Sequence, residues 1–120
     1  MKLWQRTIAI DGVDIDIADT FFRRFLGLMG RRNLAANQAL LIVPCADVHT
    51  AFMRFPIDVV FIDRSGRITK IVPHLAPWRI AVERKAYACI ELAGGAAQRL
   101  QLKAGQVLLR DRKQRPLATQ

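Results

Sequence analysis

The segment PCADVHTAFMRFPIDVVFID at positions 44–63 ends in an apolar run, residues 57–62, which predicts a buried β-strand. Pro56 precedes the run and has no backbone N–H to donate, which suits the start of a strand. A thiol, an imidazole, a guanidinium and a carboxylate occur within this segment, at Cys45, His49, Arg54 and Asp58. The pattern therefore predicts a loop that presents polar groups from a rigid sheet, the usual location of a binding site.

The regions around this segment predict further strands. Residues 63–66 (DRSG) have turn chemistry and residues 67–72 alternate apolar with polar side chains, so residues 57–72 are expected to form a hairpin. Residues 3–10 and 13–17 alternate around Asp11-Gly12, which predicts a second hairpin at the start of the chain. Further strands are expected at residues 39–43, 86–92 and 106–110, and irregular structure at residues 44–56 and 73–85.

Two short helices complete the expected fold. Asp19 is suited to cap a helix whose apolar face repeats every 3.6 residues and which stops at Gly30; that face consists of Phe21, Phe22, Phe25, Leu26 and Met29. Gly94-Gly95 introduces a brief second helix at residues 96–100. We therefore expect an α+β fold: a single small domain, residues 1–111, with a mainly antiparallel, bent or barrel-like sheet and two short helices. Residues 112–120 are expected to be a mobile basic tail.

The composition limits the classes of function. The 120 residues are 52% hydrophobic, but no window approaches the roughly 20 apolar residues that cross a bilayer, and no secretory h-region begins the chain. We therefore expect a cytoplasmic protein, in which Cys45 and Cys89 are thiols rather than a bridge. The net charge of +9 comes chiefly from arginine, and a solvated basic surface explains it without a specific partner.

Several separated motifs carry a family resemblance. They are residues 24–31 (RFLGLMGR), 44–45 (PC), 48–50 (VHT), 52–63 (FMRFPIDVVFID), Gly66, 77–79 (PWR) and 91–95 (ELAGG). Together they resemble the bacterial and archaeal domain-of-unknown-function family 192, most strongly over residues 19–108. The resemblance implies a small α+β domain with a bent, barrel-like sheet and implies no biochemical role. The family usually has glycine at the position of Gln101, so the turn after the second helix is expected to be weaker here.

A binding site for an anion is the leading hypothesis. Arg54 and Arg79 lie in different loops beside aromatic residues, and a guanidinium packed on a ring can offer a fork of donors to a carboxylate or phosphate. We expect the partner to be an anionic small molecule or an acidic protein surface. The expected ligand-binding residues are His49, Thr50, Met53, Arg54, Asp58, Trp78 and Arg79. In the alternative interpretation, Arg54 pairs with Asp58 inside the protein and Trp78 covers the core.

Two other functions are considered. A small cysteine-dependent enzyme would use Cys45 as nucleophile, His49 as base and Asp58 as the orienting carboxylate, but Pro44 disfavours the helix that would join Cys45 to His49. The pattern therefore favours binding over catalysis, and no cofactor is expected. No metal site is expected either, because the cysteines and histidines do not form the close pairs of a zinc site. Nonspecific nucleic-acid binding would use the basic charge, with Trp4, Trp78 and Tyr87 as stacking partners.

Overall fold

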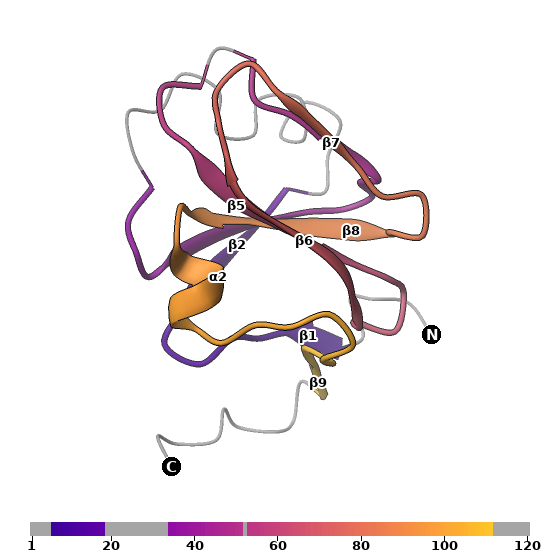
Figure 1. Ribbon diagram of the computed structural model, residues 1–120. Coiled ribbons are helices and arrows are strands. Elements are labelled where there is room, and N and C mark those ends of the chain that lie inside the picture. Colours follow the sequence, from indigo (N-terminus) through magenta and orange to yellow (C-terminus); the bar gives the residue numbers. More distant parts are fainter. Residues whose placement is uncertain (1–5, 19–33, 52, 112–120) are drawn as a thin grey trace.

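The computed structural model describes residues 6–18, 34–51 and 53–111 (Figure 1). Within these ranges it contains β1 (Arg6–Ile8), β2 (Asp14–Ala18), β3 (Gln38–Ile42), β4 (Asp47–His49), β5 (Ile57–Ile62), β6 (Ile68–Leu75), β7 (Ile80–Val82), β8 (Ala88–Ala93), α2 (Ala96–Arg99) and β9 (Leu109–Asp111). The α+β class is confirmed, with sheet predominating. The first expected helix, residues 19–30, and the expected tail, residues 112–120, lie outside the described residues.

A five-stranded sheet in the order β2-β3-β8-β5-β6 forms the centre of the molecule (Figure 1). Its pairs are antiparallel except β2 with β3, so the mainly antiparallel sheet is confirmed with one parallel pair. The expected strand at residues 57–62 is β5, and its hairpin with β6 is confirmed. The central position of β5 follows from its sequence, because only a strand covered on both faces can bury six successive side chains.

The core has two halves, one on each face of this sheet. Side chains alternate along β5, so that Val60 and Ile62 pack on one face while Val59 and Phe61 pack on the other. All four are 0% exposed. Full burial of one such side chain contributes about 1.5–3 kcal/mol, so β5 is the main apolar anchor of the fold.

The expected barrel closure is not reached. Within the described residues, β2 and β6 are the two edges of an open sheet. The β6 edge contains Pro73, which has no N–H for a further ladder partner, and a bulge opposite Asp58 interrupts the pairing there. Two small sheets, β1-β9 and β4-β7, lie below and above the central sheet in Figure 1.

The expected N-terminal hairpin is wrong in its pairing. A turn does form at Asp11-Gly12, where the Val13 N–H donates to the Ile10 carbonyl at 3.1 Å. However, β1 pairs with β9 and β2 pairs with β3. The reason is the turn type: of the two central residues, Asp11 and Gly12, only Gly12 has a positive φ, 77°. The favoured two-residue hairpin turns need positive φ at both central residues (type I′) or at the first (type II′), whereas a turn with positive φ only at the second splays the strands.

The second expected helix is confirmed as α2. Its end has the two hydrogen bonds of a Schellman motif, from Gln101 N–H to the Gln98 carbonyl at 3.0 Å and from Leu102 N–H to the Ala97 carbonyl at 2.9 Å. The motif places Gln101 at φ 58°, the left-handed region that favours glycine. The expectation of a weaker turn at this position therefore has a structural basis.

Candidate functional site

The two loops expected to carry the site are joined by a small sheet that the sequence analysis missed. Strand β4 lies within residues 44–56, strand β7 lies within residues 73–85, and the two pair antiparallel. Val48 opposes Ala81 and both are buried, whereas His49 and its partner Ile80 are exposed. Segments about thirty residues apart in the chain are therefore held side by side with one face directed outward.

Hydrogen bonds of Thr50 join the end of β4 to the segment at residues 76–79. The Thr50 hydroxyl donates to the Ala76 carbonyl at 2.6 Å and accepts from the Arg79 N–H at 2.8 Å. Its backbone N–H donates to the Arg79 carbonyl at 2.9 Å, and its own carbonyl accepts from the Trp78 N–H at 3.0 Å. Thr50 is 0% exposed, so it positions the segment at residues 76–79 rather than contacting a ligand.

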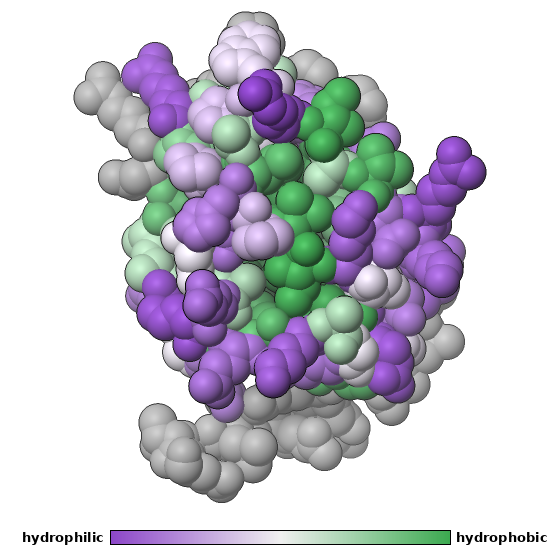
Figure 2. Space-filling view, viewed as in Figure 1, coloured by the Kyte–Doolittle hydropathy of each residue, from purple (hydrophilic) through white to green (hydrophobic). Residues whose placement is uncertain are grey.

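The exposed residues on and beside this small sheet include both large apolar side chains and cations. Trp78 is 60% exposed, Ile80 72% and Val82 48%. Arg79, Arg54 and His49 are also exposed. We call β4, β7 and residues 78–79 together the β4–β7 platform. Figure 2, viewed as Figure 1, shows hydrophobic side chains at the surface over β7 and β6, among hydrophilic ones. Exposed apolar residues that cluster in this way are typical of interaction surfaces.

Trp78 also has an unusual backbone conformation. Its φ is 64°, in the left-handed region that a bulky side chain rarely occupies. Hydrogen bonds on both sides hold this conformation, from the Trp78 N–H to Thr50 and from the Arg79 N–H to the Thr50 hydroxyl. Strained residues of this kind persist where the surrounding structure determines them, and they concentrate at functional sites.

Asp58 is placed away from the platform, in the interior. It is 0% exposed, and its carboxylate accepts three backbone hydrogen bonds, from His74 at 2.9 Å, Gly95 at 3.1 Å and Ala97 at 2.8 Å. The first donor lies in the bulge of β6 and the other two lie at the start of α2. Because Gly95, the N-cap of α2, has no side chain to cap the helix, Asp58 caps it from β5.

The remaining expected site residues differ in burial: some lie in the core and others are exposed. Met53 is 6% exposed and packs in the core, so it is not available to a ligand. Arg54 is exposed, and among the described residues the partners of the Asp58 carboxylate are backbone N–H groups, so the alternative internal pairing of Arg54 with Asp58 is not formed there. His49, Arg54, Trp78 and Arg79 thus remain as exposed members of the expected set.

The residues of the alternative cysteine-dependent enzyme lie in different surroundings. The Cys45 thiol donates to the Asp47 carbonyl at 3.0 Å and contacts the Cys89 thiol at 3.0 Å, while the side chain of His49 lies on the outward side of β4. The Asp58 carboxylate is buried and accepts three backbone hydrogen bonds. Among the described residues, no group of three or more potential ligands could hold a metal ion.

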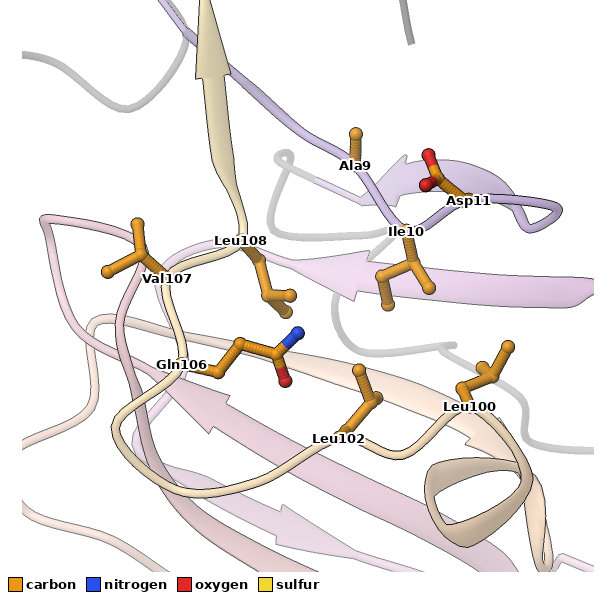
Figure 3. A pocket seen from close by; sticks show the side chains of 8 residues that line it. All are labelled: Ala9, Ile10, Asp11, Leu100, Leu102, Gln106, Val107 and Leu108. Carbon is orange, nitrogen blue, oxygen red and sulfur yellow. The ribbon is translucent and has the colours of Figure 1, made fainter. Parts of the chain in front are cut away.

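Cavities lined by described residues also lie elsewhere on the molecule. The one in Figure 3 is about 220 Å³, smaller than the 300–1,000 Å³ usual for ligand pockets. Its lining is Ala9, Ile10, Asp11, Leu100, Leu102, Gln106, Val107 and Leu108. The Gln106 side chain faces this cavity, and its amide oxygen accepts the Lys103 N–H at 3.2 Å. This oxygen is therefore already hydrogen-bonded within its own loop. The second cavity is an open groove beside Asp63 and Lys85, and the third lies along β2 and β3.

Tyr87, one of the residues expected to stack on a nucleic-acid base, lines the groove beside Lys85. Arg64 lies over the Tyr87 ring at 4.2 Å from its centroid, so a guanidinium already covers the ring that was expected to stack on a base. Trp4 lies outside the described residues. In the part of the chain that is described, no helix is long and apolar enough to cross a membrane.

Three features were not foreseen from the sequence. The pairing of β4 with β7 was missed because three-residue strands are too short to show a period, and all three residues of β7 are apolar although only Ala81 is buried. The contact of Cys45 with Cys89 joins residues 44 positions apart, which no local pattern reveals. The role of Asp58 had a signal, since a carboxylate inside an apolar strand is rarely buried without partners.

Comparison with known proteins supports the resemblance drawn from the motifs. The model of the DUF192 family, described as "Uncharacterized ACR", matches residues 5–109. A UPF0127 protein of Pyrococcus furiosus is 32% identical over 99 residues, covering 78% of this chain and 83% of the relative. A UPF0127 protein of Thermococcus sibiricus is 41% identical over 76 residues, covering 58% of this chain but only 47% of the relative.

Two solved structures are similar in fold. A protein of unknown function from Novosphingobium aromaticivorans superposes with a TM-score of 0.72 at 23% identity, covering 82% of this chain and 73% of that one. A candidate transcription regulator from Sinorhizobium meliloti also gives a TM-score of 0.72, at 25% identity, covering 82% of this chain and 79% of that one.

Proposed function

The chain belongs to the DUF192 family, whose members are uncharacterised, and from this premise we propose that it is a binding domain that recognises an acidic protein surface through the β4–β7 platform. The observation that carries the proposal is Trp78, which is 60% exposed and held at φ 64°. The left-handed conformation costs a non-glycine residue about 1–2 kcal/mol. A large exposed side chain held in a strained backbone conformation is typical of a surface that makes contacts with other molecules.

The choice of partner follows from shape and charge. Small-molecule sites are concave and enclose most of their ligand, whereas Trp78 and Ile80 stand on the surface. Exposed tryptophan and arginine are the residue types that dominate protein–protein contacts. The segments at residues 44–57 and 76–85 carry four cations, Arg54, Arg79, Arg84 and Lys85, against two acids, Asp47 and Glu83. The excess of positive charge suits an acidic protein that also offers apolar side chains.

The compartment proposed for this function is the cytoplasm. Both cysteines are free thiols, as is usual where glutathione and thioredoxin keep proteins reduced.

Selection from a displayed library of random short peptides tests the proposal. The full chain is expected to enrich peptides that combine Asp or Glu with aromatic or aliphatic residues, and the variant Trp78→Gly is expected to bind them at least tenfold more weakly. Gln101→Gly is the matched control, because it makes the same kind of change at another left-handed site, φ 58°, on the exposed turn after α2. That control is expected to bind the selected peptides as the unchanged chain does.

Stability measurements separate binding from a structural role of Trp78. Relief of strain offsets the loss of its partial burial, so Trp78→Gly is expected to change the free energy of unfolding by less than about 2 kcal/mol. A tryptophan that covers the core would cost about 3–5 kcal/mol on truncation. Such a loss, or equal peptide binding by both glycine variants, would refute the proposal.

Nucleic-acid binding is the second candidate. It is favoured by the similarity in fold to the candidate transcription regulator and by the net charge of +9. Binding of a labelled DNA duplex is measured at increasing salt and with different sequences. Affinity that falls steeply with salt and shows no sequence preference would indicate only electrostatic attraction to phosphates, whereas sequence preference would favour this candidate over the acidic protein.

A further inference from the structure

We infer that Cys45 and Cys89 form a dithiol modification site, which a small-molecule disulfide converts to an intramolecular disulfide. The inference rests on the geometry of the two thiols and does not depend on the proposed function. Their sulfur atoms lie 3.0 Å apart although the residues are 44 positions apart in the chain. The sulfurs of a disulfide are about 2.05 Å apart, so closure requires a movement of only about 1 Å.

The fold holds the two thiols in this relation. Cys89 lies within β8, opposite Ile42 of β3 and Phe61 of β5, so its backbone is fixed on both sides. The Cys45 N–H donates to the Tyr87 carbonyl at 2.8 Å, which holds the Cys45 backbone against the chain just before β8. The pair is therefore built by the core sheet and not by chance proximity of two mobile loops.

The two thiols differ in accessibility, and this sets their roles. Cys45 is partly exposed, whereas Cys89 is 0% exposed. Only Cys45 can meet a disulfide arriving from solvent. Cys89 can then react only with a sulfur already inside the protein, which at 3.0 Å is that of Cys45. Cys45 is thus the reacting thiol and Cys89 the resolving thiol.

In the reduced protein, hydrogen bonds hold the thiols of Cys45 and Cys89 in place. The Cys89 thiol donates to the sulfur of Cys45, and the Cys45 thiol donates to the Asp47 carbonyl at 3.0 Å. The hydrogen bond to Cys45 and burial raise the pKa of Cys89 well above its usual value of 9.0, and the charges of Cys45, Glu91 and Asp47 act in the same direction. The resolving thiol therefore stays protonated until Cys45 has been modified, and resolution becomes faster as pH rises.

The exchange balances in two steps. The Cys45 thiolate attacks one sulfur of the small disulfide, whose S–S bond breaks; one small thiol leaves with the proton given up by Cys45, and a mixed disulfide remains. Cys89 then loses its proton and attacks the sulfur of Cys45, and the second small thiol leaves and takes up that proton. Two protein thiols and one small disulfide become one protein disulfide and two small thiols, so the protein is oxidised and the small disulfide reduced.

The disulfide would join the segment just before β4, and with it the β4–β7 platform, covalently to the central sheet. Cys45 lies two residues before β4, and Cys89 lies in the central sheet. A bond between them closes residues 45–89 into a covalent ring that includes both β4 and β7. Oxidation is therefore expected to slow backbone opening at β4, which hydrogen exchange of the Val48 amide would report.

Intact-mass spectrometry of the full chain treated with oxidised glutathione tests the inference. The unchanged chain is expected to lose the mass of two hydrogen atoms and to retain no glutathione, and peptide mapping is expected to find Cys45 joined to Cys89. Cys89→Ala lacks the resolving thiol and is expected to keep one glutathione on Cys45. Cys45→Ala is expected to remain unmodified, because its single thiol is buried.

Three results would overturn the inference. The first is a glutathione adduct that persists on the unchanged chain. The second is a disulfide between two copies of the chain. The third is a folded chain whose two thiols stay unreacted under conditions in which the urea-unfolded chain reacts. Each is read on the unchanged protein, so the conclusion does not depend on whether either variant folds.

Discussion

The buried carboxylate of Asp58 makes a quantitative prediction, because its two oxygens accept different hydrogen bonds. Oδ1 accepts the N–H groups of His74 and Gly95, and Oδ2 accepts that of Ala97. In Asp58→Asn one oxygen becomes an NH₂ donor, which faces one of these N–H donors. The substitution therefore removes at least one hydrogen bond and places two donors against each other.

The magnitude follows from burial of the donors. The bond to Ala97 is buried, and an unpaired buried N–H costs about 1–3 kcal/mol. The bonds to His74 and Gly95 are partly buried and contribute about 0.5–1.5 kcal/mol each. Asp58→Ala, which loses all three, is expected to destabilise the fold by about 2–6 kcal/mol, and Asp58→Asn by about 1–3 kcal/mol. The free energy of unfolding of a typical domain is about 5–15 kcal/mol, so both losses are measurable.

Urea denaturation at neutral pH measures both losses, with Asp63→Asn as the matched control. Asp63 also accepts three hydrogen bonds, from the N–H and hydroxyl of Ser65 and the N–H of Arg67, but all three reach the same oxygen, Oδ1. An asparagine keeps that oxygen, so the control is expected to change the free energy of unfolding by less than about 1 kcal/mol. If Asp58→Asn costs no more than Asp63→Asn, the capping argument for Asp58 is wrong.

The turn at Gln101 and the titrating groups of Asp63 and Cys89 should each affect stability measurably. Gln101→Gly is expected to raise the free energy of unfolding by about 0.5–1 kcal/mol, since glycine adopts φ 58° without strain; an unchanged urea midpoint would contradict this. Burial by itself raises the pKa of Asp63, but hydrogen bonds from Ser65 and Arg67 outweigh it and lower the pKa below 3.8. Its stabilisation is therefore present above about pH 4 and lost as pH falls below that value, so Asp63→Asn should flatten the acid limb of a stability–pH curve. The raised pKa of Cys89 acts in the opposite direction: its contribution is present below the ordinary thiol pKa and lost as pH rises above about 9, and stability measured from pH 8 to 10 should fall less in Cys89→Ala than in the unchanged chain.

The sequence by itself determined the features that depend on neighbouring residues. The run at residues 57–62 is apolar at every position but Asp58, and a strand of this kind is stable only at the centre of a sheet, where β5 lies. The turn at residues 63–66 and the glycine pair at 94–95 were likewise readable, because turn chemistry acts through local backbone angles. The family resemblance was likewise readable from the sequence alone, and the DUF192 model matches residues 5–109.

The tertiary structure decided which distant segments meet. It joined β4 to β7, brought the thiol of Cys45 to that of Cys89, and carried Asp58 to the start of α2. The hairpin expected at Asp11-Gly12 does not form, because β1 pairs with β9 and β2 pairs with β3. The physical reason is the same in each case: a hydrogen bond or contact between residues far apart in the chain depends on how the whole sheet is ordered and registered. That order minimises the exposed apolar surface and unpaired backbone groups of the entire domain, a quantity that no local window of sequence contains.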